Sequence, residues 1–148
     1  MQGWVRRLRH FATTDGMGLL ILGAASIGRG VSYAPGIIPD STRSSHVAET
    51  WLSMTAWSVV WVSVGVLCLI AAGDWRSRGA ALAVGLAVGL HFLWGASFLW
   101  GTLSGDMGRG YVSALSYLAI CFLALWAFSR GRREDGAPRE VMHRDGTD

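Results

Sequence analysis

The feature that most constrains this chain is an uncharged run over residues 79–103, GAALAVGLAVGLHFLWGASFLWGTL. A helix needs about 20 apolar residues to cross the hydrocarbon core of a bilayer, and this run is longer than that. In lipid, backbone N–H and C=O groups must be paired within the protein, which a helix does within one segment. The run therefore predicts a membrane-spanning helix.

Three other apolar segments have the same character. They cover about 16–33, 51–72 and 111–128. The connection over residues 73–78 is short, so the segments it joins are expected to be antiparallel neighbours. The sequence thus predicts an all-α protein whose domain at 15–129 is an antiparallel four-helix bundle in a membrane.

Charged residues make up 16% of the chain, whereas a soluble domain carries about a quarter. They gather outside the apolar segments. Residues 1–14 form a basic amphipathic lead, and residues 130–148 form a charged tail that we expect to be disordered because it can bury little apolar area. The lead and first segment also fit a secretory signal peptide, but we expect a retained helix.

Arginine placement predicts the orientation. With both termini in the cytoplasm, ten arginines lie on the cytoplasmic side, against Arg43, Arg109 and the nearly buried Arg29 on the other. Cytoplasmic loops carry the excess of basic residues. We therefore expect an N-in, C-in, multi-pass protein of the cytoplasmic (inner) membrane. The same arginines favour anionic lipid, not nucleic acid, as the partner of the net charge of +3.

Small residues recur every four positions in the third segment, at Ala81, Gly85 and Gly89. They fall on one helix face, where small side chains let helix backbones approach closely in lipid. This small-residue stripe predicts helix packing. We expect contact within the bundle, and contact with a second copy of the chain is the alternative.

A polar and aromatic layer is predicted between the second and third segments. At 1.5 Å per residue, His91 reaches the depth of Trp61, and Trp94 that of Trp57. His91 has three interpretations: a packed histidine, which we favour, a proton-sensitive residue, or a haem ligand. Haem would need a second axial donor, which only a symmetric dimer supplies, so we expect no cofactor.

Arg29 lies inside the first apolar segment, where a charge costs about 2.5–3.5 kcal/mol at the bilayer centre. It is near the segment's end, so we expect it to reach the surface. The alternative is an intramembrane ion pair with Asp40, Glu49 or Asp106. His46 and Glu49 share a helix face, and we expect them to form a solvated helix start.

Nothing in the apolar segments indicates catalysis or a metal. They contain no Asp or Glu, and Ser97 lies six residues from His91, on roughly the opposite helix face. Cys68 and Cys121 fit buried free thiols, and no Cys and His pattern resembles a zinc site. We expect a protein that is not an enzyme.

In its all-arginine basic residues, basic N-terminus, Trp- and Gly-rich segments and charged tail, the chain resembles small multi-span membrane proteins of actinobacterial phages. That resemblance implies holin-like activity, in which copies oligomerise and permeabilise the membrane during lysis. The competing hypothesis is an interaction subunit or an exclusion or immunity factor that binds another membrane protein. A channel that depends on His91 is a third.

Overall fold

The computed structural model describes residues 15–37 and 46–135. These residues form α-helices and two short 3-10 helices, with no strand among them, so the all-α prediction is confirmed for this part of the chain. In order, the elements are α2 (Asp15–Ser32), η2 (Val47–Thr50), α3 (Met54–Ala71), η3 (Ala72–Asp74), α4 (Arg78–Leu103) and α5 (Gly110–Asp135). The predicted lead at 1–14 lies outside the described residues.

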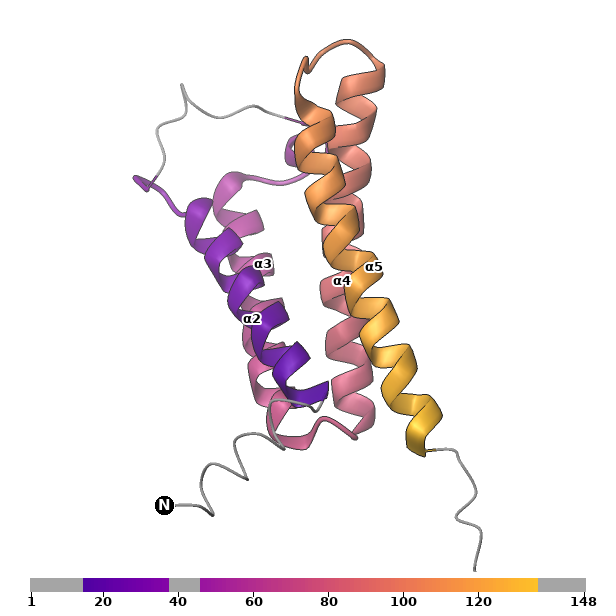
Figure 1. Cartoon of the computed structure of the whole chain (residues 1–148). Coiled ribbons are helices and arrows are strands. Elements are labelled where there is room, and N and C mark those ends of the chain that lie inside the picture. Colours follow the sequence, from indigo (N-terminus) through magenta and orange to yellow (C-terminus); the bar gives the residue numbers. More distant parts are fainter. Residues whose placement is uncertain (1–14, 38–45, 136–148) are drawn as a thin grey trace, which may run out of the picture.

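The helices form two antiparallel hairpins. α2 packs along α3 and α4 packs along α5, while the hairpins meet each other mainly through α3 and α4. Figure 1 shows the two hairpins leaning apart, with α4 and α5 extending beyond the other pair at the top. We call this the η2 end: α2 and α4 finish there, α3 and α5 begin there, and η2 packs on α4.

Three helical segments are long and apolar enough to cross a membrane. They are Met54–Asp74, Arg78–Leu103 and Gly110–Arg130. The apolar part of the remaining helix, Gly16–Ser32, is shorter. The composition of the chain is therefore that of a membrane protein.

Side-chain caps set two helix starts that differ from the predicted ones. The Ser53 hydroxyl accepts from the backbone N–H of Ala56, so α3 begins at Met54 and not at residue 51. The Ser77 hydroxyl accepts from the Ala80 N–H at the start of α4. Each cap satisfies a backbone donor that the first turn of a helix leaves unpaired.

The predicted boundary of the tail at residue 130 is wrong. α5 continues to Asp135, because the segment after residue 128 contains no proline to stop the helix before that point. The rest of the predicted tail, residues 136–148, lies outside the described residues.

Glycines hold α2 directly against α3. A Cβ atom added at Gly65 would lie 2.7 Å from the Gly23 carbonyl oxygen and 2.9 Å from the Ile27 nitrogen. One at Gly30 would lie 2.9 Å from the Val62 nitrogen. Only glycine permits backbones this close, which is how small residues join helices in lipid.

The expected internal contact of the small-residue stripe is not made. Gly85 and Gly89 are exposed on α4, and a Cβ atom at either position would meet nothing within 4 Å in the part of the chain that the structure describes. Ala81 is exposed as well. The buried face of α4 is instead the one that carries Ala83, Ala87 and Trp94. The prediction that the stripe packs within the bundle is therefore wrong. Contact with a second copy of the chain remains the alternative.

Candidate functional site

A cluster of buried polar side chains lies at the η2 end and joins the two hairpins. We call it the Tyr33 cluster. Its members are Arg29 from α2, Tyr33 just after α2, His46 and Glu49 beside and within η2, and Trp94 and Ser97 from α4. The 3-10 helix η2 and two α-helices that are distant in sequence, α2 and α4, thus meet through hydrogen bonds.

The hydroxyl of Tyr33 is the centre of the cluster. It accepts a hydrogen bond from Arg29 Nη2 at 2.8 Å and another from Trp94 Nε1 at 2.8 Å. It donates to Glu49 Oε1 at 2.7 Å. Because a hydroxyl has one donor and two acceptor sites, these three bonds use its full capacity. Tyr33 is 2% exposed, so the arrangement is removed from solvent.

Ser97 fixes η2 against α4. Its hydroxyl oxygen accepts from the Ala48 N–H at 2.9 Å and lies 2.9 Å from His46 Nδ1. If the hydroxyl donates to Nδ1, the neutral imidazole carries its proton on Nε2, which faces Glu49 Oε1 at 3.4 Å. The Trp57 indole completes the junction by donating to the Ala48 carbonyl at 3.1 Å.

His46 and Glu49 are buried, with 4% and 7% of their surfaces exposed, so the expectation of a solvated helix start is wrong. Their apolar surroundings include the Phe98 ring, whose centroid is 4.3 Å from that of His46. Burial lowers the pKa of His46, although the nearby Glu49 carboxylate opposes that shift. Desolvation penalises the charged form of an imidazole, so His46 is held neutral near pH 7.

The four residues of the predicted polar and aromatic layer lie together. Trp94 stands edge-on to Trp57, with ring centroids 4.5 Å apart, and to Trp61 at 5.1 Å. Trp61 stands edge-on to His91 at 5.0 Å. Edge-to-face pairs at these separations are favourable. All four are buried, so the layer forms the contact between α3 and α4.

His91 makes a local hydrogen bond, from Nδ1 to the Ala87 carbonyl at 2.8 Å. A carbonyl oxygen can only accept, so Nδ1 carries the proton and Nε2 is an acceptor in the neutral ring. The ring also lies 5.9 Å from that of Tyr117 on α5. These contacts are those of a packed histidine, and none of them supplies an axial partner for haem.

Arg29 is half-buried and reaches the cluster, not only the surface. It is linked to Glu49 through the Tyr33 hydroxyl, and the direct ion pair with Glu49 that was the alternative is not found among the described residues. Its guanidinium also lies 4.7 Å from the Tyr33 ring centroid and 5.5 Å from that of Tyr117. Asp40, another predicted partner, lies outside the described residues.

Sequence reasoning missed Tyr33 and discounted Ser97. Tyr33 is the last residue of the first predicted apolar segment, and a tyrosine at the end of such a segment usually marks the membrane interface. Ser97 does lie on a different face of α4 from His91, but that face receives η2. A serine within the apolar segment 79–103 was a signal, since a buried polar group needs a partner, but nothing in the sequence indicated His46 as that partner.

The described residues contain no group of three His, Cys, Asp or Glu side chains that could hold a metal ion. Searches against protein-family models, curated proteins and solved structures find no match.

Proposed function

We propose that the chain is a four-span, N-in and C-in protein of the cytoplasmic membrane that works by associating with further copies of itself. In this proposal α2 is the additional span. Its 18 residues measure about 27 Å at 1.5 Å per residue, close to the hydrocarbon thickness of about 30 Å. Apart from Asp15 at its first position, the one charged residue of α2 is Arg29, which the Tyr33 cluster balances inside the protein.

The observation that supports self-association is the outward position of the small-residue stripe. Elsewhere the chain uses glycine to bring backbones together: Gly23 and Gly65 meet between α2 and α3. Gly85 and Gly89 also lie on an apolar helix, but a Cβ atom at either position has no other described element within 4 Å. Helices in lipid associate by close packing and not by the hydrophobic effect, so this face of α4 is suited to a second copy.

Holin-like permeabilisation is the activity that fits this behaviour best. It requires assembly in the membrane and needs no catalytic residue. The residues that would control it are then Ala81, Gly85 and Gly89, because they set how closely copies approach. The buried Tyr33 cluster keeps the two hairpins of each copy together while copies gather.

A second candidate is an interaction subunit or an exclusion or immunity factor. It is favoured by the direction of the polar side chains in α4. Its histidine and Ser97 point into the protein, whereas exposed residues such as Leu82, Phe92 and Trp100 are apolar. A water-filled lesion needs a polar lining, and α4 offers none without rearrangement. In that case the exposed face would bind a different membrane protein.

Induction of the chain alone in a bacterial host separates the two. A holin-like protein collapses the membrane potential after a delay, once enough copies have gathered. Gly85→Leu should lengthen that delay by blocking close approach, whereas Gly28→Leu should not, since Gly28 is an exposed helical glycine off the stripe with nothing within 4 Å. His91→Ala should change the delay less than Gly85→Leu.

A membrane potential that persists at high, verified membrane expression would contradict holin-like activity and favour the second candidate. Depolarisation that is immediate, varies with external pH and disappears in His91→Ala would contradict both and indicate a path lined by His91.

A further inference from the structure

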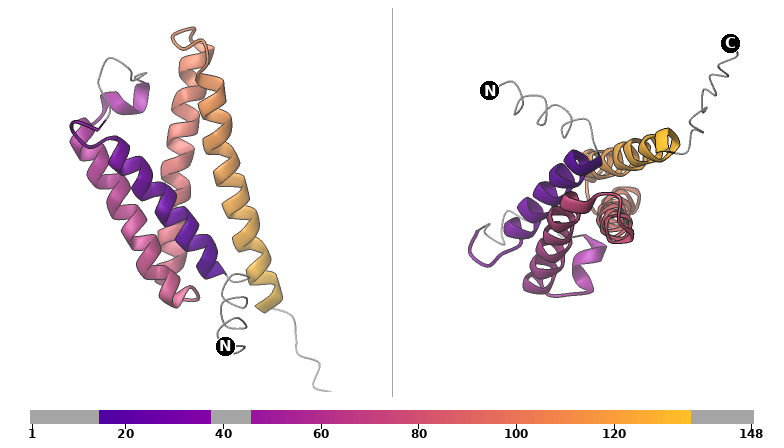
Figure 2. Two further views of the ribbon diagram at one scale, coloured as in Figure 1. Left: turned by 60° about the vertical axis from the view of Figure 1, so that its left-hand side comes forward. Right: turned by 90° about the horizontal axis from the view of Figure 1, so that it is seen from below.

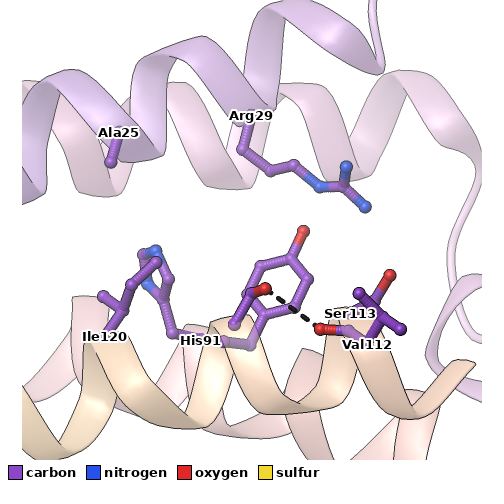
Figure 3. A pocket seen from close by; sticks show the side chains of 8 residues that line it. Ala25, Arg29, His91, Val112, Ser113 and Ile120 are labelled. Carbon is purple, nitrogen blue, oxygen red and sulfur yellow. Dashed lines mark hydrogen bonds between the residues drawn. The ribbon is translucent and has the colours of Figure 1, made fainter.

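A partly open cavity of about 320 Å³ lies between the two hairpins, on the side where α2 faces α5. Both hairpins contribute to its lining. The lining residues are Ala25 and Arg29 from α2, His91 from α4, and Val112, Ser113, Ser116, Tyr117 and Ile120 from α5. Figure 3 shows Arg29 reaching from α2 towards Val112 and Ser113, with His91 and Ile120 at the other end.

The guanidinium of Arg29 is the main hydrogen-bonding group at one end of the cavity. The guanidinium has five N–H donors, and its Nη2 bond to Tyr33 uses one of them. Arg29 Nε is buried and has no hydrogen-bond partner among the described residues. Glu49 does not supply one: its Oε1 receives the Tyr33 hydroxyl, and its Oε2 has no hydrogen-bond partner among the described residues either. A buried donor without a partner is destabilising, so the Arg29 guanidinium, which lines the cavity, favours an acceptor placed beside it.

Much of the remaining lining is hydrocarbon, although His91 and Tyr117 also contribute to it. Ala25, Val112 and Ile120 carry only hydrocarbon, and Ser116 is already bonded to the Val112 carbonyl at 3.0 Å. Pockets of this kind, apolar with a few convergent polar groups, bind small molecules, and their volumes begin at about 300 Å³. This cavity is at the small end of that range, so it suits a head group and the first part of a chain.

We propose that the cavity binds the oxyanion head of an amphiphile, with Arg29 as the residue that recognises the anion and Ser113 as an additional donor. The apolar tail would leave between α2 and α5, where the two hairpins touch little. The carboxylate of a fatty acid and the phosphate of an acidic phospholipid share this chemistry. The proposal depends on the membrane placement of the helices but not on self-association.

The test uses the purified full-length chain in a neutral detergent, titrated with oleate, with a short-chain phosphatidylglycerol and with uncharged methyl oleate. Thermal stability and retention of the probe in native mass spectrometry are measured. The oxyanion probes should raise the melting temperature, because a ligand that binds only the folded state stabilises it. Arg29→Gln should weaken their binding about tenfold or more, the loss expected for a charge-assisted bond.

Arg29 also belongs to the Tyr33 cluster, so a second variant leaves the cluster intact. Ala25→Leu narrows the cavity from α2, and it should weaken binding while the unliganded protein keeps its stability. Gly28→Leu is the matched control, because it also adds a leucine at an exposed position of α2 but lies outside the cavity.

A response to oleate alone would assign the cavity to fatty acids, one to phosphatidylglycerol alone would assign it to lipid phosphate, and either supports the proposal. An equal response to methyl oleate, or wild-type binding by Ala25→Leu, would overturn it. If Arg29→Gln does not fold, the comparison of Ala25→Leu with Gly28→Leu decides alone.

Discussion

Adding one methyl group at Gly65 tests how α2 and α3 are held together. In Gly65→Ala the new Cβ atom would lie 2.7 Å from the Gly23 carbonyl oxygen and 2.9 Å from the Ile27 backbone nitrogen. Both distances are well below an ordinary contact, and both atoms belong to a helix backbone that cannot rotate away. The two helices must therefore separate by several tenths of an ångström along their whole interface.

The size of the effect follows from two opposing contributions. Overpacking a well-packed interior costs about 1–3 kcal/mol, while replacing glycine by alanine within a helix gains about 1 kcal/mol. Gly28→Ala has only the second contribution, because nothing lies within 4 Å of its Cβ position. The difference between the two variants cancels the gain in helix propensity. We expect Gly65→Ala to be less stable than Gly28→Ala by about 1–3 kcal/mol.

Unfolding of both variants in the same detergent, by titration with a denaturing detergent and by heat, measures that difference. Gly65→Ala should unfold first. Equal stability of Gly65→Ala and Gly28→Ala would contradict this prediction and would mean that α2 and α3 are not in backbone contact at this point.

The remaining predictions concern the Tyr33 cluster. Tyr33→Phe should lower the free energy of unfolding by about 2–4 kcal/mol, because three buried partners lose their common hydroxyl. Tyr111→Phe, at an exposed tyrosine, is the control and should change it little. Ser97→Ala should cost about 1–3 kcal/mol, whereas Ser116→Ala, on an exposed surface, should not. Burial lowers the pKa of His46, so below about pH 6.5 the unfolded chain takes up a proton that the folded chain refuses. Stability should fall as the pH drops below that value, by at most about 1.4 kcal/mol per pH unit from this group, and His46→Gln should flatten the slope. A stability that rises on acidification would contradict the burial of a neutral His46.

The helices could be predicted because each depends on local sequence. Uncharged runs, short connections and capping serines determine where α3, α4 and α5 lie. The layer of Trp57, Trp61, His91 and Trp94 was also accessible, since counting residues along antiparallel helices gives their depths. Such arguments need no knowledge of how the helices rotate about their axes.

The sequence could not supply the rotation of each helix about its own axis. Gly85 and Gly89 share a face whichever way α4 turns, and only the packing of the hairpins decides that this face points outward. The burial of His46 and Glu49 is a tertiary effect of the same kind. A polar loop is expected to be solvated. This one becomes part of the core only because Tyr33, just after α2, and Ser97, in α4, offer hydrogen-bond partners.

Cysteine cross-linking in membranes tests self-association through α4 most directly. Gly85→Cys and Gly28→Cys place a thiol at two exposed helical glycines with open surroundings, and the native Cys68 and Cys121 are buried. Under mild oxidation, Gly85→Cys should give a covalent dimer at low expression, while Gly28→Cys and the wild type stay monomeric. A dimer yield from Gly85→Cys no greater than that from Gly28→Cys would contradict association through this face.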